Sequence, residues 1–261
     1  MKSIALFLAI STSATALDLP PAGDVLRNTG RAVEAFSSQF SAVNCTESVT
    51  QDKLSKDGKT VYRKNSEFDY LVLMRQVDGD LLVEESRVET KPADKPEPVP
   101  LLMTRGFSTL LLVFHPRYQH SYEYAPPERD EMNGIEVLRV GFRQVRNAPS
   151  PSALRLRNRD YPLEWRGTAW IDPRSSSVLR IVAELNGSMQ DLGLQSLSAE
   201  VVYTPVKFAG AASEYWLPGV ATIDARTGLQ HWRNVHRFAN YKHFTVETTT
   251  KTELPKEGGL P

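Results

Sequence analysis

Turn signals divide most of this chain into short β-strand patterns, and this division limits its possible folds more than any other feature of the sequence. Asp57-Gly58, Asp78-Gly79 and Asn133-Gly134 are dipeptides typical of tight hairpin turns. The segments between such signals are rich in β-branched and aromatic residues, and roughly ten of them follow one another. The strand–helix–strand alternation of a parallel sheet is missing. The sequence therefore predicts an antiparallel sheet built mainly of hairpins.

The predicted elements include two helical segments. The first covers residues 24–40, with Asp24 as its cap, and the second covers the apolar residues 110–114, with Thr109 as its cap and His115-Pro116 as its end. Strands are expected from residue 45 onward, and then over residues 60–76, 81–89, 118–124, 135–146, 163–171, 178–185, 196–208, 214–226, 229–240 and 242–251. Residues 91–100 and 148–160 are predicted loops. So many strands in sequence tend to curl or close into a barrel, which leaves room for a small ligand.

The N-terminus has the pattern of a cleavable signal peptide. Lys2 precedes a short apolar run over residues 4–10, and Ala14-Thr15-Ala16 fits the small-x-small pattern of a cleavage site after Ala16. No stretch reaches the roughly 20 apolar residues that a membrane span needs, so an integral membrane protein is not expected. We expect residues 1–16 to be removed, residues 17–254 to form one domain, residues 255–261 to form a flexible tail, and the product to be periplasmic or secreted.

Charge and cysteine content exclude several classes of protein. The 31 basic and 31 acidic residues balance, and removal of Lys2 leaves a net charge of −1, without the basic excess of a nucleic-acid binder. Cys45 is the only cysteine, so an intramolecular disulfide and a multi-cysteine metal site are excluded. We expect Cys45 to be a small buried residue.

Catalytic signatures are missing from the sequence. It contains no GxSxG, HExxH, Walker or GxGxxG motif, and we expect neither an enzyme nor a cofactor. His231, His236 and His243 are separated by odd spacings, which place neighbours on opposite faces of a strand and disfavour a metal site. The arginine-rich residues 155–159 are interpreted as a solvated loop, with binding of an anionic partner as the alternative.

Apolar residues exceed what one face of a sheet requires. Tyr70, Val72 and Met74 share one face of a strand, Leu71 and Leu73 share the other, and the dense apolar run over residues 110–114 must also be covered. A curved sheet with a helix on its concave side would use all of them. Two interpretations stay open, a solid core filled by these side chains and a cavity for an acyl chain or a similar apolar ligand.

Three short segments are similar to motifs of known exported proteins. Residues 167–173 (GTAWIDP), followed by 178–181 (VLRI), resemble a hairpin common in outer-membrane lipoprotein-sorting-like proteins, and 214–218 (EYWLP) resembles a later strand of exported members. Together these segments resemble the LolA/LolB-like superfamily of lipoprotein carriers. The order of signal, N-terminal helix, hairpins, central apolar helix and closing meander is also similar. The resemblance implies a mainly β (α+β) fold, an unclosed antiparallel barrel with a helical lid, and a hydrophobic cavity for lipid chains. It leaves the position of the carrier's lid-holding arginine open.

The combined prediction is an exported binding protein that holds the acyl chain of a lipid or lipoprotein, and that also contacts a protein of the envelope. The alternative is an envelope scaffold or sensor with a filled interior and no transported ligand. The candidate cavity and lid residues are Phe36, Phe40, Tyr70, Val72, Met74, Phe107, Leu110, Leu111, Phe114, Trp170 and Ile181.

Overall fold

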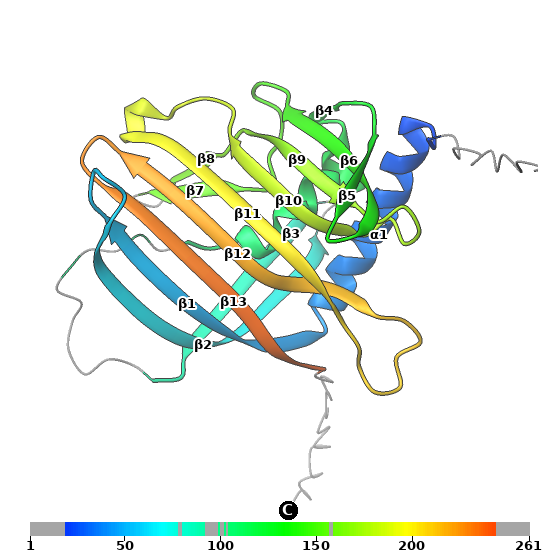
Figure 1. The fold of residues 1–261 in the computed structure, drawn as a ribbon, viewed down its shortest axis with the longest axis horizontal. Helices are drawn as coiled ribbons and strands as arrows, with labels where there is room; N and C mark the ends of the chain where they lie inside the picture. Colours follow the sequence, from blue (N-terminus) through cyan, green and yellow to red (C-terminus); the bar gives the residue numbers. More distant parts are fainter. Residues whose placement is uncertain are drawn as a thin grey trace, which may run out of the picture.

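The computed structural model describes residues 19–77, 80–91, 99, 102, 104–156 and 159–243. Antiparallel strands dominate it (Figure 1). The helices are α1 (Ala22–Phe40), η1 (Phe107–Phe114), α2 (Pro116–Gln119) and η2 (Gln190–Leu192). The strands are β1 (Val43–Leu54), β2 (Thr60–Val77), β3 (Asp80–Glu89), β4 (Tyr122–Tyr124), β5 (Glu128–Met132), β6 (Ile135–Gln144), β7 (Ala153–Leu156), β8 (Arg159–Pro162), β9 (Trp165–Ile171), β10 (Val178–Leu185), β11 (Leu194–Val206), β12 (Tyr215–Thr227) and β13 (His231–His243).

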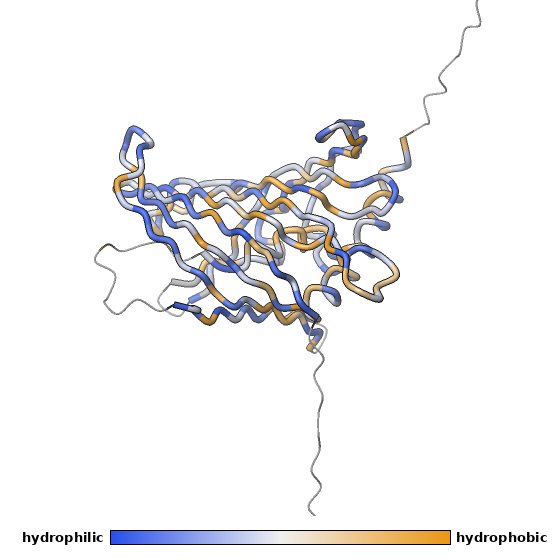
Figure 2. The backbone as a smooth tube through the Cα atoms, turned by 60° about the horizontal axis from the view of Figure 1, so that its bottom comes forward, coloured by the Kyte–Doolittle hydropathy of each residue, from blue (hydrophilic) through white to orange (hydrophobic). Residues whose placement is uncertain are grey.

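One antiparallel sheet of eleven strands forms the body of the protein. Its order is β3-β2-β1-β13-β12-β11-β10-β9-β6-β4, and β5 also pairs with β6. In the part of the chain that the structure describes, β3 and β4 end this order without pairing with each other, so the sheet curves but does not close. The strands alternate between hydrophobic and hydrophilic residues, as expected for a sheet with one covered face (Figure 2). This confirms the predicted fold class, an unclosed antiparallel half-barrel.

Helices α1 and η1 cover the concave face of the sheet. Val25, Val33, Phe36 and Phe40 lie at helical spacing on α1 and are buried, which makes α1 amphipathic. Helix α1 contacts η1, β1, β2 and β12, while η1 contacts β10, β11 and β12. None of the described helices is both long enough and apolar enough to cross a membrane.

The start of each predicted helix differs from the expectation. Helix α1 begins at Ala22 after Pro21, so Asp24 lies in its first turn and is not its cap. The second segment is a 3-10 helix that follows Gly106, a residue in the left-handed conformation with φ of +76°. Thr109 lies inside it with non-helical angles, and its hydroxyl donates a hydrogen bond to the carbonyl of Gly106. A glycine with positive φ therefore sets the start of η1, and the prediction of Thr109 as the cap was wrong.

Most predicted strands are confirmed within a few residues, and four regions require correction. Residues 128–132 were not predicted as a strand but form β5, which pairs with β6. Residues 148–160 were predicted as a loop but contain β7 and the start of β8, which pair as a small separate sheet. The predicted strand over 118–124 is divided between α2 and β4. The predicted break before Lys242 is absent, because β13 continues to His243. The signal peptide, the Asp78-Gly79 turn and the tail lie outside the described residues.

Candidate ligand-binding site

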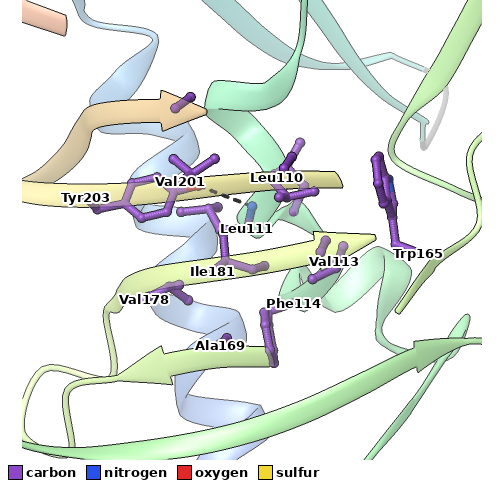
Figure 3. Close-up of a cluster of buried hydrophobic side chains, with 14 of the residues drawn as sticks. Leu110, Leu111, Val113, Phe114, Trp165, Ala169, Val178, Ile181, Val201 and Tyr203 are labelled. Atoms are coloured by element: carbon purple, nitrogen blue, oxygen red, sulfur yellow. Dashed lines mark hydrogen bonds between the residues drawn. The ribbon is translucent and has the colours of Figure 1, made fainter. Parts of the chain in front are cut away.

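The concave face of the sheet is filled by η1. Residues 110–114 are each exposed by 3% or less, and the run Leu110, Leu111, Leu112, Val113 and Phe114 belongs to the main hydrophobic cluster. The short helix lies against the sheet, and Val178, Ile181 and Val201 are among the buried residues of the same cluster (Figure 3). A helix that is apolar on all its sides, as η1 is over residues 110–114, is stable only where it is buried on most of them, and the curved sheet provides this burial.

Most of the sequence-predicted site residues meet in this one cluster. Eight of them are buried within it, and they come from α1, β2, η1 and β10: Phe36, Phe40, Tyr70, Val72, Leu110, Leu111, Phe114 and Ile181. Met74 and Phe107 are partly buried and pack against it. We expected both faces of this part of β2 to be covered. On the concave side Tyr70 and Val72 are buried, whereas Leu71 and Leu73 on the other face are only partly buried.

Trp170 does not join this group. Its neighbours Ala169 and Ile171 are buried in the concave core, so Trp170 points to the opposite face of β9. There its indole Nε1 donates a hydrogen bond to Asp130 at 3.0 Å, and the guanidinium of Arg180 lies 4.4 Å from the centre of an indole ring. The indole of Trp170 therefore contacts Asp130 and Arg180 on the convex surface and does not face the concave core.

Two surface hollows occur in the described part of the structure, and the first lies beside η1, because the rings of Tyr124 and Phe142 in its lining pack against Phe114. The first, of about 530 Å³, is lined by Tyr124, Gly141 and Arg143 among others, and the second, of about 490 Å³, is lined by Pro20, Ile135 and Leu138 among others. Neither is lined by a residue of η1.

A buried ionic network holds the segment before η1 against the sheet. Arg87 on β3 donates to both carboxylate oxygens of Glu47 on β1, at 2.5 and 2.8 Å, and to the carbonyl of Thr104 at 2.8 Å. The side chain of Glu47 is 0% exposed and that of Arg87 is 10% exposed. A bidentate pair of this kind is strong and geometrically specific. We call Glu47, Arg87, Thr104 and His236 the latch.

His236 on β13 completes the latch. Its Nδ1 lies 2.7 Å from an oxygen of Glu47, and its Nε2 lies 2.7 Å from the hydroxyl of Thr104. Since Nδ1 donates to the carboxylate, a neutral His236 accepts from Thr104 through Nε2. Thr104 is then free to accept from Nδ2 of Asn234 at 3.0 Å. Every ring nitrogen and the Thr104 hydroxyl are satisfied in this arrangement.

A second set of hydrogen bonds reaches the start of η1. The hydroxyl of Tyr70 donates to Glu85 at 2.6 Å and lies 2.8 Å from the hydroxyl of Ser108. Glu85 also accepts from the backbone N–H of Gly106 at 3.0 Å. On the other side of η1, the hydroxyl of Tyr203 lies 3.3 Å from the N–H of Leu111, which donates to it. These bonds hold Gly106, Ser108 and Leu111 in place, at the start and in the middle of η1.

Burial and hydrogen bonds set the protonation of these groups. Burial raises the pKa of Glu47, but the hydrogen bonds from His236 and Arg87 outweigh this effect and hold the pKa below its ordinary value. Burial, together with the neighbouring Glu85 carboxylate, raises the pKa of Tyr70 well above its ordinary value. Glu47 is therefore ionised and Tyr70 neutral at neutral pH. Burial also raises the pKa of the Cys45 thiol to about 12, in agreement with the expected buried cysteine.

Sequence reasoning missed the latch because its members are far apart in the chain. His236 and Glu47 are 189 residues apart, and Arg87 and Glu47 are 40 residues apart. One local signal was present: Glu47 interrupts the alternating apolar residues Val43, Cys45 and Val49 on the inward face of β1. The expected opposite orientation of His231 and His236 is observed, because His231 pairs with Asp224 on the other face. No group of three or more metal-binding side chains occurs among the described residues.

Comparisons with known proteins find likeness in structure only. Neither a protein-family model nor a curated protein matches the chain. A crystal structure of a DUF1329 family protein from Desulfovibrio piger ATCC 29098 matches with a TM-score of 0.50 at 12% identity, over 88% of this chain and 96% of that one. At this identity the likeness concerns the fold alone.

Two further crystal structures match less closely. One is a putative outer membrane lipoprotein-sorting protein domain from Vibrio parahaemolyticus, with a TM-score of 0.48 at 11% identity over 87% of this chain and 95% of that one. The other is a LolA superfamily protein from Nitrosomonas europaea, with a TM-score of 0.38 at 9% identity over 88% and 96%. The strand order of the sheet shows the unclosed half-barrel fold that the sequence predicts, and the likeness to the Desulfovibrio piger structure agrees with it.

Proposed function

We propose that this protein is an exported, non-enzymatic carrier that holds the acyl chain of a lipid or lipoprotein on the concave face of its sheet. Binding requires η1 to leave that face, so η1 acts as a lid that also fills the empty site. The observation that supports this proposal best is the complete burial of five consecutive apolar residues, 110–114, on a 3-10 helix of eight residues. The 3-10 helix has poorer hydrogen-bond geometry than an α-helix, which makes η1 a suitable element to move.

The free energy gained by burying an acyl chain on the concave face is similar to the free energy gained by burying the apolar side chains of η1 there. Burying a twelve-carbon chain is worth about 9 kcal/mol, at about 0.8 kcal/mol for each methylene. Exposing five large apolar side chains costs about 1.5–3 kcal/mol each, or about 7–15 kcal/mol together. Exchange between η1 and an acyl chain would thus be close to balanced. A carrier needs this balance, because it must both load and release its ligand.

Polar contacts give η1 a defined hinge. The latch holds Thr104, while Gly106 has a positive φ and Thr109 breaks the helical geometry inside η1. Rotation of the backbone at Gly106 and Thr109 would move residues 110–114 away from the sheet without unfolding the strands. Ligand exchange and release of η1 are then the same event.

Uptake of a fluorescent fatty acid tests this function. Replacing Leu111 and Phe114 by Asp should raise the affinity for the fatty acid, because buried carboxylates weaken the packing of η1 on the face that the acyl chain would take, while the far-UV circular dichroism stays rich in β-structure. Leu229→Asp is the matched control, because Leu229 is 96% exposed and lies in the β12–β13 turn. Unchanged uptake by the Leu111 and Phe114 variants would exclude η1 as the lid.

The filled concave face also favours a second function, an envelope scaffold or sensor of the same fold that transports nothing. Native mass spectrometry after gentle purification distinguishes the two. A mass that includes lipid supports the carrier, and an apo mass combined with no dye binding supports the scaffold. Export itself is tested by N-terminal sequencing of the mature protein, which should begin at Leu17.

A further inference from the structure

The indole N–H of Trp165 is buried without a hydrogen-bond partner. Trp165 is 0% exposed, and its Nε1 has no partner among the described residues. Its backbone N–H is satisfied by the side-chain oxygen of Gln144 at 3.2 Å. The indole group is thus the unsatisfied part of this residue. A buried donor without an acceptor costs free energy, and folded proteins contain few of them.

Trp170, on the same strand, has the opposite arrangement. Its Nε1 donates to Asp130 at 3.0 Å on the convex face. A phenylalanine at position 165 would fill much of the same space without carrying a donor. The donor of Trp165 is therefore a polar group in the core that the closed structure does not use.

The position of Trp165 ties this donor to the movement of η1. Trp165 stands at the end of the buried cluster, beyond Val113 in Figure 3. The ring of Phe107 packs edge-on against it, with the ring centres 6.3 Å apart. Phe107 is the first residue of η1 and directly follows Gly106 at the hinge. When η1 moves off the sheet, Phe107 moves with it and uncovers the indole.

We propose that Trp165 binds an oxygen of the ligand's acyl group, so that the concave site prefers fatty acids or their esters to plain hydrocarbons of the same length. This inference rests on the proposed function. An indole N–H is a neutral donor, so it suits both a carboxylate and an ester carbonyl. With the oxygen at Trp165, the hydrocarbon chain extends along the surface that Leu110, Leu111 and Phe114 occupy in the closed structure.

Three probes of equal chain length test the inference: dodecanoic acid, methyl dodecanoate and dodecane, each displacing a fluorescent fatty acid. Trp165→Phe should lower the affinity for the acid, the ester or both by about five- to tenfold, which is the value of one hydrogen bond. The affinity for dodecane should stay unchanged. Comparison of the acid with the ester shows whether Trp165 binds a carboxylate oxygen or an ester oxygen. Trp170→Phe is the matched control and should leave the affinities for all three probes unchanged. Equal weakening of all three by Trp165→Phe would reduce the role of Trp165 to packing and overturn the inference.

A spectroscopic measurement on the wild-type protein keeps the test independent of variant folding. The indole N–H resonance of Trp165 should shift downfield when dodecanoic acid or its methyl ester is added, but not when dodecane is added. Probes that bind without moving this resonance overturn the inference and leave the proposed function standing. A wild-type protein that binds none of the probes overturns both.

Discussion

Arg87 reaches from β3 across the intervening strand β2 to the carboxylate of Glu47 on β1, and its guanidinium passes 5.2 Å from the ring centre of Tyr70 on the way. One arginine thus joins three strands of the concave face and also binds the carbonyl of Thr104, just before the hinge of η1. The closed position of η1 is therefore fixed by a buried charge pair as well as by apolar packing.

Removing Arg87 should destabilise the protein strongly. Arg87→Gln leaves Glu47 as an uncompensated buried charge, which should lower the free energy of unfolding by about 3–5 kcal/mol. Urea denaturation measures this change. Arg75→Gln is the control, since the Arg75–Glu84 pair is exposed, and it should cost at most about 1 kcal/mol. Equal effects of the two variants would show that the Arg87–Glu47 pair is not buried in solution.

Stability should fall in acid because of Glu47. Burial raises the pKa of Glu47, but the hydrogen bonds from His236 and Arg87 lower it by a larger amount. The folded-state pKa therefore lies below the ordinary value of 4.5. A lowered folded-state pKa gives stability that is present above 4.5 and is lost as the pH falls through the folded-state value. The melting temperature of the wild type should therefore drop below pH 4.5 more steeply than that of Glu47→Gln. Parallel curves would contradict this assignment.

The sequence predicts the successive β-hairpins well because the turns and strands of a hairpin are encoded by neighbouring residues. Asn133 and Gly134 both have positive φ, as a tight turn between β5 and β6 requires, and the predicted strand over residues 178–185 matches β10 at both ends. The small β7–β8 sheet was missed because proline and arginine in residues 148–160 are typical of loops, while the pairing of β7 with β8 overrides this preference.

The candidate site was predictable only in its apolar part. A segment rich in leucine and aromatic residues is expected to be buried. Phe36, Leu111 and Ile181 were therefore predicted correctly as buried residues. Which face a residue uses depends on strand register, and Trp170 was included although its side chain lies on the convex surface. The latch depends on β1 pairing with β13, two strands at opposite ends of the chain, and no local pattern encodes that contact.

Gly167 should be intolerant of even a methyl group. A Cβ there would lie 2.1 Å from the carbonyl oxygen of Val182 and 2.8 Å from the ring of Phe142. Gly167→Ala should therefore destabilise the protein by about 1–3 kcal/mol or more through displacement of β9. Gly187→Ala, where nothing lies within 4 Å, should change the unfolding midpoint little. A tolerated Gly167→Ala would mean that β9 and β10 are farther apart than the structure shows.

Loosening η1 should tighten ligand binding. Tyr203→Phe removes the hydroxyl that accepts from Leu111 and donates to the carbonyl of Ser108, which weakens the closed state by about 0.5–1.5 kcal/mol. Because the apparent affinity depends on the open fraction, fatty-acid affinity should rise by up to about tenfold while overall stability falls.

Tyr241→Phe provides the control for this experiment. The hydroxyl of Tyr241 donates to the carbonyl of Pro218 and does not contact η1, so its loss should reduce stability without raising affinity. Fluorescence titration gives the affinities, and urea denaturation gives the stabilities. Equal affinity of the wild type and Tyr203→Phe would show that η1 does not compete with the ligand.

Hydrogen exchange with and without dodecanoic acid tests the central claim most directly. In the closed protein the amide of Leu111 bonds to Tyr203 and residues 110–114 are buried. If an acyl chain replaces η1 on the sheet, peptides covering residues 107–114 should exchange faster when ligand is bound, while peptides from β12 and β13 stay protected. Binding of the acid with no change, or with slower exchange, in residues 107–114 would contradict displacement of η1.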